Sequence, residues 1–329
     1  MKEAKHFRAL SFGKSAWRAV VALGMAGIAG CAGKAEALPS TGDPELIGGQ
    51  PADANHFRST VGISDDCTAA KVGPRLFLTA AHCVSLARPN RSSFPPPDFP
   101  PNGGVHDRYL PGNPLLMFWG LDAADGDRAE FTIVKTTIHP SWWACPTCQD
   151  AILDDGAADV AVIEIGEDTP QIPEARVELA SIATGTPVVK VGWGCEERTN
   201  VDANTLQLGR YKTADASIIS GSEIRRFDTP MTDEQFDAVD ASYLVTAGHD
   251  QDEKRASLCL GDSGGPLYLR DGRDPRIVGV NADYSFRPVQ EPDLGGVSWT
   301  DWHTRTSLEA RHGVGQWLID LKVKTVGGH

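Results

Sequence analysis

The chain has 329 residues and a net charge of −13 at pH 7, and 41% of its residues are hydrophobic. The acidic balance argues against a general nucleic-acid-binding protein, because phosphate binding needs a basic face. The 34 Gly and 22 Pro residues favour a loop-rich β protein over a helical bundle. No stretch of the sequence reaches the roughly 20 consecutive apolar residues of a membrane-spanning helix.

The N-terminal residues 1–30 are typical of an export signal. Several basic side chains precede the apolar run Ala19–Ile28. Residues 28–31, Ile-Ala-Gly-Cys, are similar to a bacterial lipobox, in which the Cys is acylated and becomes the mature N-terminus. A competing cleavage site at Ala35-Glu36-Ala37 would give a soluble chain. Both routes predict an exported protein, and the first predicts attachment to a membrane through a lipid on Cys31.

The first predicted strand covers residues 75–79 and leads to His82. This strand is short and apolar, and a turn of small residues follows it. A His that is fixed beside Cys83 after such a turn is typical of a positioned general base. A packed His beside a structural disulfide has the same pattern, so this segment alone does not decide between the two.

Residues 89–114 form a predicted loop that contains eight Pro residues. Pro lacks a backbone donor, so such a run cannot pair within a sheet interior. A linker between domains would have a similar composition. We interpret the segment as an inserted loop, because strand-like runs of the same kind continue on both sides.

Asp159 stands at the start of a second predicted strand, residues 160–165. This run is rich in Val and Ile, as buried strands are. An Asp at the mouth of such a strand can be buried and can hold an imidazole in one tautomer. Taken alone, it also fits an ordinary turn residue at the start of a strand.

Two further predicted strands, 187–191 and 276–280, lie on either side of the segment that contains Ser263. Gly residues on both sides of Ser263 let the backbone bend tightly and direct its N–H groups inward. Residues 261–265 also match the G-x-S-x-G motif of esterases and lipases.

The last predicted element is a helix over about residues 314–323. Its apolar residues recur at helical spacing, so that they share one face: Val314, Trp317, Leu318 and Leu321. No internal repeat of the solenoid type is present in the sequence.

Together and in this order, His82, Asp159 and Ser263 resemble the triad of the chymotrypsin-like (trypsin) family of serine endopeptidases. Residues 79–83 read Thr-Ala-Ala-His-Cys, and residues 261–266 read Gly-Asp-Ser-Gly-Gly-Pro. Weaker matches to the family are Leu46–Gly49, Ile138–Ser141, Gly192–Gly194 and Gln316–Ile319. The order His-Asp-Ser argues against an α/β-hydrolase, whose order is Ser-Asp-His. With its signal segment, the chain resembles an exported bacterial member of lipoprotein type.

The resemblance implies an all-β fold of two six-stranded antiparallel barrels with a C-terminal helix. The protease domain would cover residues 46–325, with barrel 1 at about 46–170, barrel 2 at about 180–310 and the helix at about 314–323. His82 and Asp159 would then belong to the first barrel and Ser263 to the second. The active site would therefore exist only when both barrels pack together.

The resemblance also implies the chemistry. Ser263 would be the nucleophile, His82 its general base, and Asp159 the group that orients His82. The backbone N–H groups of Gly261 and Ser263 would form the oxyanion hole. The substrate would be a protein or peptide, cleaved through an acyl-enzyme, with no metal or cofactor. The alternative is a catalytically inactive homologue that acts as a surface binding protein.

In this family a new N-terminal ammonium, freed by proteolysis, pairs with the Asp that corresponds to Asp262. The matching terminus here is Leu46, which makes residues 31–45 a linker or propeptide and implies an activating protease as a partner. Glu45 precedes the cut, where Arg or Lys is usual. Cleavage before Leu46 would also separate the enzyme from a lipid on Cys31.

Six Cys residues remain besides Cys31, and sequence alone allows fifteen pairings among them. The resemblance implies a disulfide Cys67–Cys83 beside His82, and it favours a second one, Cys195–Cys259. Cys145-x-x-Cys148 has metal-site or redox spacing, but it lacks a second pair and a βαβ context. We therefore predict a local disulfide Cys145–Cys148.

The resemblance places Ser257 at the base of the primary substrate pocket, with Ala282 and Tyr284 on its wall. Ser257 provides no countercharge for a basic side chain, so we expect a preference for an apolar or aromatic residue before the scissile bond. Asp283 would disfavour acidic substrates. His303 falls where pocket-wall residues occur, or alternatively lies on the surface.

Overall fold

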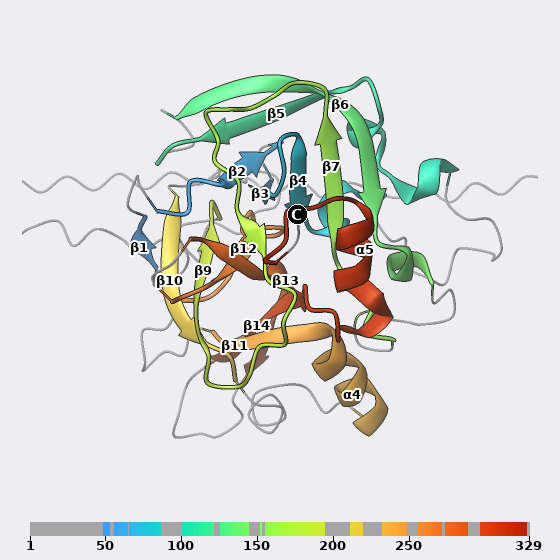
Figure 1. Cartoon of the computed structure of the whole chain (residues 1–329). Coiled ribbons are helices and arrows are strands. Elements are labelled where there is room, and N and C mark those ends of the chain that lie inside the picture. Colours follow the sequence, from blue (N-terminus) through green and yellow to red (C-terminus); the bar gives the residue numbers. More distant parts are fainter. Residues whose placement is uncertain are drawn as a thin grey trace, which may run out of the picture. The chain divides into compact units, whose positions relative to one another are not determined.

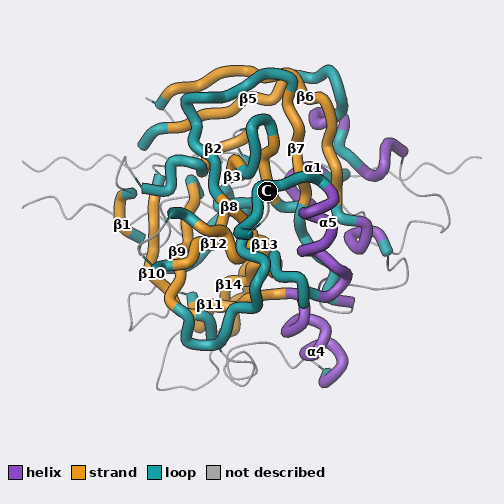
Figure 2. The backbone as a smooth tube through the Cα atoms, viewed as in Figure 1, coloured by secondary structure: helices purple, strands orange, loops and turns teal. Residues whose placement is uncertain are grey.

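The structure, a computed structural model, describes residues 49–52, 56–64, 66–86, 101–121, 126–144, 152, 155–194, 211–219, 232–248, 256–271, 274–288 and 297–327. Strands and loops make up most of this part of the chain (Figure 2). None of its helices is both long and apolar enough to cross a membrane. The predictions on residues 1–30, Cys31, Leu46, Cys145, Cys148 and Cys195 lie outside the described residues.

Six antiparallel strands in the first half of the chain form a closed barrel in the order β2-β3-β4-β7-β6-β5 (Figure 1). These strands are β2 (Thr60–Ile63), β3 (Cys67–Lys71), β4 (Leu76–Thr79), β5 (Pro114–Trp119), β6 (Asp127–Ile138) and β7 (Ala161–Ile165). The register pairs Thr79 at the end of β4 with Ala161 at the start of β7. The ends of these two strands therefore lie together at one edge of the barrel.

The second half of the chain, together with the N-terminal strand β1, forms an eight-stranded sheet in the order β1-β10-β9-β12-β13-β14-β11, with β8 pairing with β13. Its strands are β1 (Gln50–Pro51), β8 (Arg176–Val177), β9 (Pro187–Gly192), β10 (Lys212–Ser217), β11 (Tyr243–Ala247), β12 (Pro266–Leu269), β13 (Arg276–Pro288) and β14 (Val297–Arg305). A bridge between Ile218 and Thr246 brings the chain after β10 against β11, so the sheet curls back on itself.

The predicted all-β fold of two barrel-like halves is confirmed, and the first half is a closed six-stranded barrel as predicted. The second half differs in detail, because it is a half-barrel built from an eight-stranded sheet rather than from six strands. The strands predicted at 75–79, 160–165, 187–191 and 276–280 correspond to β4, β7, β9 and β13. Two short strands do not follow the division of the sequence into halves. The N-terminal strand β1 pairs with β10 of the second sheet, and β8, from the connection between the halves, pairs in parallel with β13.

Two large apolar clusters lie on the two faces of these strands. Successive side chains of a strand point to opposite faces, so many strand residues of both sets are buried. One fills the closed barrel and includes Phe77, Leu115 and Met117. The other lies between the two barrels, where the ring of Phe118 on β5 meets that of Trp193 edge-on, 5.0 Å between centroids. Burial of this apolar surface is the main force that holds the two barrels together.

The helices are α1 (Ala81–Val84), α4 (Asp233–Ser242) and α5 (Val314–Asp320), with short 3₁₀ turns at Pro101–Gly104, Asp107–Tyr109, Pro140–Trp143 and Arg311–Gly313. The predicted C-terminal helix is present but ends at Asp320 rather than 323. Its Trp317 ring packs against the His139 ring, 5.0 Å between centroids. The sequence analysis missed α4, although Thr232 and Gln235 form a capping box at its start.

The structure describes the second part of the predicted Pro-rich loop, from residue 101 onward. Two 3₁₀ turns occupy it, and Tyr109 is buried in the barrel cluster. The predicted loop extends one residue too far, because Pro114 is the first residue of β5. Pro is compatible with that position, where a strand begins.

Candidate active site

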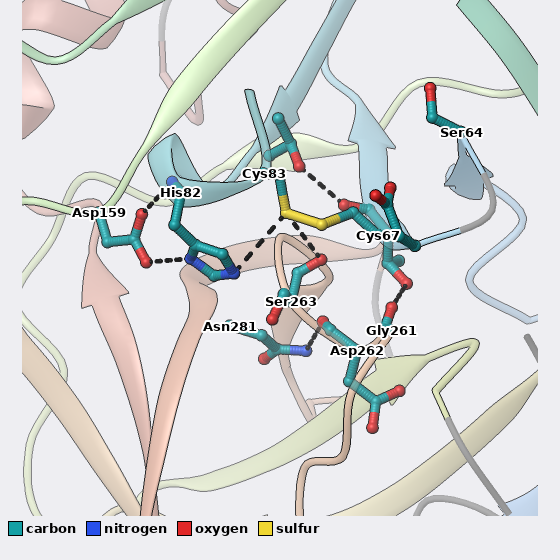
Figure 3. Close-up of a disulfide and its surroundings, with 12 residues drawn as sticks. Ser64, Cys67, His82, Cys83, Asp159, Gly261, Asp262, Ser263 and Asn281 are labelled. Atoms are coloured by element: carbon teal, nitrogen blue, oxygen red, sulfur yellow. Dashed lines mark hydrogen bonds and ion pairs between the residues drawn. A yellow bond between two sulfur atoms is a disulfide. The ribbon is translucent and has the colours of Figure 1, made fainter. Parts of the chain in front are cut away.

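The pairing of β4 with β7 brings His82 and Asp159 together. His82 follows β4 by three residues, in α1, and Asp159 precedes β7 by two. The backbone N–H of His82 donates to Asp159 Oδ1 at 2.8 Å, and His82 Nδ1 lies 2.6 Å from Asp159 Oδ2. One carboxylate thus fixes both the main chain and the imidazole of His82, and it directs Nε2 away from itself (Figure 3).

Asp159 is held from the second barrel as well. Its side chain is only 1% exposed, and Thr304 Oγ1 on β14 donates to its backbone carbonyl at 2.9 Å. Burial lowers the pKa of His82, but the charge of Asp159 and its hydrogen bond to Nδ1 outweigh this effect and raise the pKa above its usual value. An imidazole with this environment can take up a proton and hold it as a stabilised imidazolium.

Ser263 is held next to this pair by a backbone hydrogen bond from the strand β3, and a disulfide packs against its carbonyl. Cys67 on β3 and Cys83 are joined by a disulfide. The backbone N–H of Thr68 donates to the Ser263 carbonyl at 2.8 Å. Cys83 Sγ lies 3.6 Å from this same carbonyl and 3.9 Å from His82 Nε2. Figure 3 shows the His82 ring between Asp159 and Ser263. The three side chains that the sequence analysis selected are therefore neighbours.

The backbone before Ser263 presents two N–H groups that have no partner in the described part of the chain, those of Gly261 and Ser263. Gly261 has φ of 98°, a conformation that favours Gly. Thr68 Oγ1 donates to the Gly261 carbonyl at 2.7 Å and so fixes the direction of the following peptide. Two N–H groups held in this way can stabilise a negative oxygen.

Asp262 lies behind this backbone turn and is fully buried. Its two carboxylate oxygens accept hydrogen bonds from Gly194 N–H at 2.7 Å and Cys259 N–H at 2.8 Å. Burial raises the pKa of Asp262 to about 7, and these hydrogen bonds only partly oppose it. A cation placed beside such a buried carboxyl group would strongly stabilise its ionised form.

The residues predicted for the substrate pocket have different environments. Ser257 is buried, and its Oγ donates to Asp301 Oδ1 at 3.0 Å. Ala282 is 4% exposed and belongs to an apolar cluster with Tyr243 and Trp302. The side chain of Tyr284 lies outside the described residues.

The interpretation of His303 as a surface residue is wrong, because His303 is fully buried. Its Nδ1 lies 2.8 Å from Asn281 Oδ1 and its Nε2 lies 3.1 Å from Thr246 Oγ1. The sequence analysis did not single out Asp301, nor Lys190, whose Nζ lies 2.6 Å from Asp301 Oδ2. A single Lys within the otherwise apolar run Val188–Val191 is the signal that would have found the second of these.

Within the described residues, one group of side chains with metal-ligand atoms comes together, namely Cys67, His82 and Cys83. Both sulfur atoms belong to the disulfide, so neither offers the thiolate that binds a metal. Cys259 is also disulfide-bonded, and its predicted partner Cys195 lies outside the described residues.

Comparisons with known proteins agree with this arrangement. The family model described as Trypsin matches residues 120–291, which include Asp159 and Ser263. Chymotrypsin-like elastase family member 1 of Homo sapiens is 24% identical over 265 residues, 76% of this chain and 85% of that protein. The protein of the same name from Canis lupus familiaris is 22% identical over 258 residues, 74% of this chain and 83% of that protein.

Among solved structures, the secreted serine protease VesC from Vibrio cholerae superposes with a TM-score of 0.52 at 16% identity. The match covers 83% of this chain and 48% of the VesC chain, so this chain spans about half of that protein's length. At this level of identity the likeness shows the fold.

Proposed function

Because this chain belongs to the trypsin family of serine endopeptidases, we propose that Ser263, His82 and Asp159 are its catalytic triad. The observation that carries the proposal is the double contact of buried Asp159 with His82, on the side of the ring away from Ser263 (Figure 3). This contact leaves Nε2 to serve the hydroxyl of Ser263. The neutral ring then donates from Nδ1 to Asp159 and accepts at Nε2.

In the proposed reaction, Ser263 Oγ attacks the carbonyl carbon of the scissile peptide bond while His82 Nε2 takes the hydroxyl proton. The oxygen of the tetrahedral intermediate accepts from the N–H groups of Gly261 and Ser263. His82 then gives its proton to the leaving amine, and an acyl-enzyme remains on Ser263. Water, deprotonated by His82, hydrolyses this ester and regenerates the hydroxyl.

We propose further that cleavage before Leu46 activates the enzyme. The new ammonium of Leu46 would pair with Asp262, whose buried carboxylate accepts two backbone hydrogen bonds within the described residues and whose pKa is raised to about 7. A cation there would lower this pKa and keep the carboxylate ionised. Since Asp262 lies between Gly261 and Ser263, this pairing would fix the peptides that form the oxyanion hole.

The proposed organisation of the whole chain is a signal peptide at 1–30, a linker or propeptide at 31–45 and a protease domain at 46–325. Export is supported by the signal-like sequence and by the description of VesC as secreted. Lipidation of Cys31 would attach the precursor to a membrane, and the cut before Leu46 would release the protease. We also propose the disulfides Cys195–Cys259 and Cys145–Cys148.

The decisive experiment uses protein that begins at a free Leu46, treated with a fluorophosphonate probe and a peptide substrate. We expect labelling and turnover in this protein and neither in Ser263→Ala. Ser181→Ala, which changes an exposed Ser, is the matched control and should label normally. A folded chain that neither labels nor turns over would contradict the proposal and favour the non-catalytic binding homologue.

A further inference from the structure

A buried ion pair lies directly against Ser257. Lys190 on β9 and Asp301 on β14 are 1% and 0% exposed, and Lys190 Nζ lies 2.6 Å from Asp301 Oδ2. Each charged side chain lies within a strand, and the residues next to it along that strand are buried. Two opposite charges that are both removed from water need each other, because either one alone would be strongly destabilising.

The hydrogen bonds of this pair are complete on the side of Lys190. Its ammonium donates to Asp301 Oδ2, to the Ala256 carbonyl and, at 3.3 Å, to the Ala247 carbonyl. An ammonium group has three N–H donors, so none is left for a substrate. Asp301 Oδ1 accepts from Ser257 Oγ at 3.0 Å and from Leu258 N–H at 3.1 Å.

These contacts tie the pair to three consecutive residues, 256–258, which precede the turn that carries Ser263. Asp301 is also opposite Tyr284 in the register of β13 with β14. The carboxylate is therefore bonded to Ser257, the proposed base of the substrate pocket, and its strand pairs with the proposed pocket wall. Asp301 brings to the pocket base a negative charge that Ser257 itself lacks.

Without Lys190, that carboxylate would attract a substrate side chain that carries a positive charge. With Lys190 in place, the net charge of the Lys190–Asp301 pair is zero. Nearby His303 adds no charge, because burial and the positive charge of Lys190 lower its pKa well below its ordinary value. Among the described residues, the proposed floor of the pocket thus contains charged groups whose charges cancel.

We propose that the Lys190–Asp301 pair determines primary specificity: Lys190 neutralises Asp301, so that the pocket accepts uncharged side chains before the scissile bond. Removal of Lys190 would convert the same pocket to a preference for Arg and Lys. This inference rests on the proposed function, because it assumes that Ser263 cleaves peptides and that Ser257 lies at the pocket base.

The test compares three peptides that differ only in the residue before the scissile bond, Leu, Arg or Glu. In the wild-type protein we expect kcat/KM for Leu to exceed that for both charged peptides. In Lys190→Met the Arg-to-Leu ratio of kcat/KM should rise by about ten-fold or more. Lys71→Met is the matched control, since Lys71 is a buried Lys on β3 that donates to the carbonyls of Thr169 and Ile172. It should leave the ratio unchanged.

Two further variants keep the test informative if Lys190→Met does not fold. Asp301→Asn leaves Lys190 without its counterion and should raise the Glu-to-Leu ratio. Lys190→Met combined with Asp301→Asn removes both charges and should restore the wild-type ratios. A wild-type enzyme that prefers Arg or Lys would overturn the inference without any variant, as would a folded Lys190→Met protein with an unchanged ratio.

Fluorophosphonate titration of every protein separates this inference from the proposed function. If the wild type labels at Ser263 and cleaves peptides while the ratios do not respond to either charge, the specificity role fails and the proposed function stands. If the folded wild type does not label, the proposed function fails, and the specificity role fails with it.

Discussion

The interior of the closed barrel is mainly apolar, whereas the second sheet buries a connected network of polar and charged side chains. The closed barrel, whose edge carries His82 and Asp159, contains a continuous apolar cluster that includes Ile63, Leu115 and Met117. These side chains are each at most 1% exposed. Packing of this kind depends on shape and buried area, and it does not change with pH or with charge.

The second sheet has apolar clusters too, but it also buries a connected polar network. Lys190 pairs with Asp301, and His303 bonds to Asn281, whose amide in turn donates to the carbonyls of Val191 and Asp262. All of these side chains are at most 1% exposed. Buried polar networks are strong when every member is satisfied and costly when one is removed.

This difference indicates that the two barrels contribute different properties to the site. In the proposed mechanism, the first barrel holds the base His82 and its orienting carboxylate Asp159 at a fixed distance. The second sheet holds the proposed nucleophile Ser263 and, by the inference above, sets the charge that a substrate meets. Changes in the first should therefore affect rate or stability without altering selectivity, whereas changes in the second should alter selectivity.

The largest effect is expected for Asp159→Asn. An amide at this position cannot accept from His82 Nδ1–H in the same way, so the imidazole takes the wrong tautomer and the imidazolium loses its counterion. We expect kcat to fall by about 10⁴-fold with the fold intact, as for the equivalent change in serine-protease triads generally. Steady-state kinetics and circular dichroism measure the two properties. A folded variant with less than about ten-fold loss would show that Asp159 does not orient His82.

A cavity in the closed barrel tests whether changes there affect stability without altering selectivity. Leu115 is fully buried on β5, and Leu115→Ala should reduce the free energy of unfolding by about 2–5 kcal/mol. The Arg-to-Leu ratio of kcat/KM should not change. Leu121→Ala is the control, because Leu121 is 42% exposed and should cost about 0.5 kcal/mol or less. A changed Arg-to-Leu ratio in Leu115→Ala would show that the closed barrel also influences selectivity.

The sequence predicted the parts of this site that short local motifs encode. His82 and Ser263 stand in runs whose turn residues and neighbours are adjacent along the chain, so the family resemblance could select them, whereas each segment alone left alternatives open. The Lys190–Asp301 pair was not visible. It joins residues 111 positions apart, and nothing local to either one indicates the other. Ser257 alone predicted an uncharged pocket base. In the structure, Ser257 bonds to the carboxylate of Asp301, 44 residues away, and Lys190 neutralises the charge of that carboxylate.

Helix α4 was missed for a different reason. Its capping box at Thr232 is a local signal, but α4 lacks a clear apolar stripe, and only Ala238, Val239 and Ser242 are buried. Periodicity therefore favoured α5, whose Val314 and Leu318 lie on one buried face. Local propensity and helical periodicity are independent signals, and short surface helices often show only the first.

Thr68 offers a smaller effect that links the two barrels. Its hydroxyl, on β3, donates to the Gly261 carbonyl, in the peptide that lies between the two N–H groups of the proposed oxyanion hole. Thr68→Val removes this hydrogen bond at nearly constant volume, which is worth about 1 kcal/mol and thus about five-fold in kcat. Thr79→Val is the matched control, because Thr79 Oγ1 donates to the Thr68 carbonyl and not to Gly261. An equal loss of kcat in both variants would indicate general loosening rather than a role of Thr68 in positioning Gly261.

The smallest effect is that of a charge in the second sheet on the pKa of His82 in the first barrel. Exposed Asp283 on β13 is one of the negative charges that raise the pKa of His82, after Asp159 itself. His82 acts as a base only when neutral, so activity should appear as pH rises through its raised pKa. Asp283→Asn removes a charge that favours the imidazolium, and the acid limb of kcat/KM should therefore move to lower pH.

An exposed charge acts through solvent, so the shift caused by Asp283→Asn should shrink as salt rises from low to physiological ionic strength. Asp320→Asn, on α5, is the control, because this exposed carboxylate is not among the main causes of the pKa shift of His82. The measurement is the pH profile of kcat/KM on an uncharged peptide at two salt concentrations. An acid limb that stays in place at low salt, or moves to higher pH, would show that the second sheet tunes the substrate pocket without tuning the base.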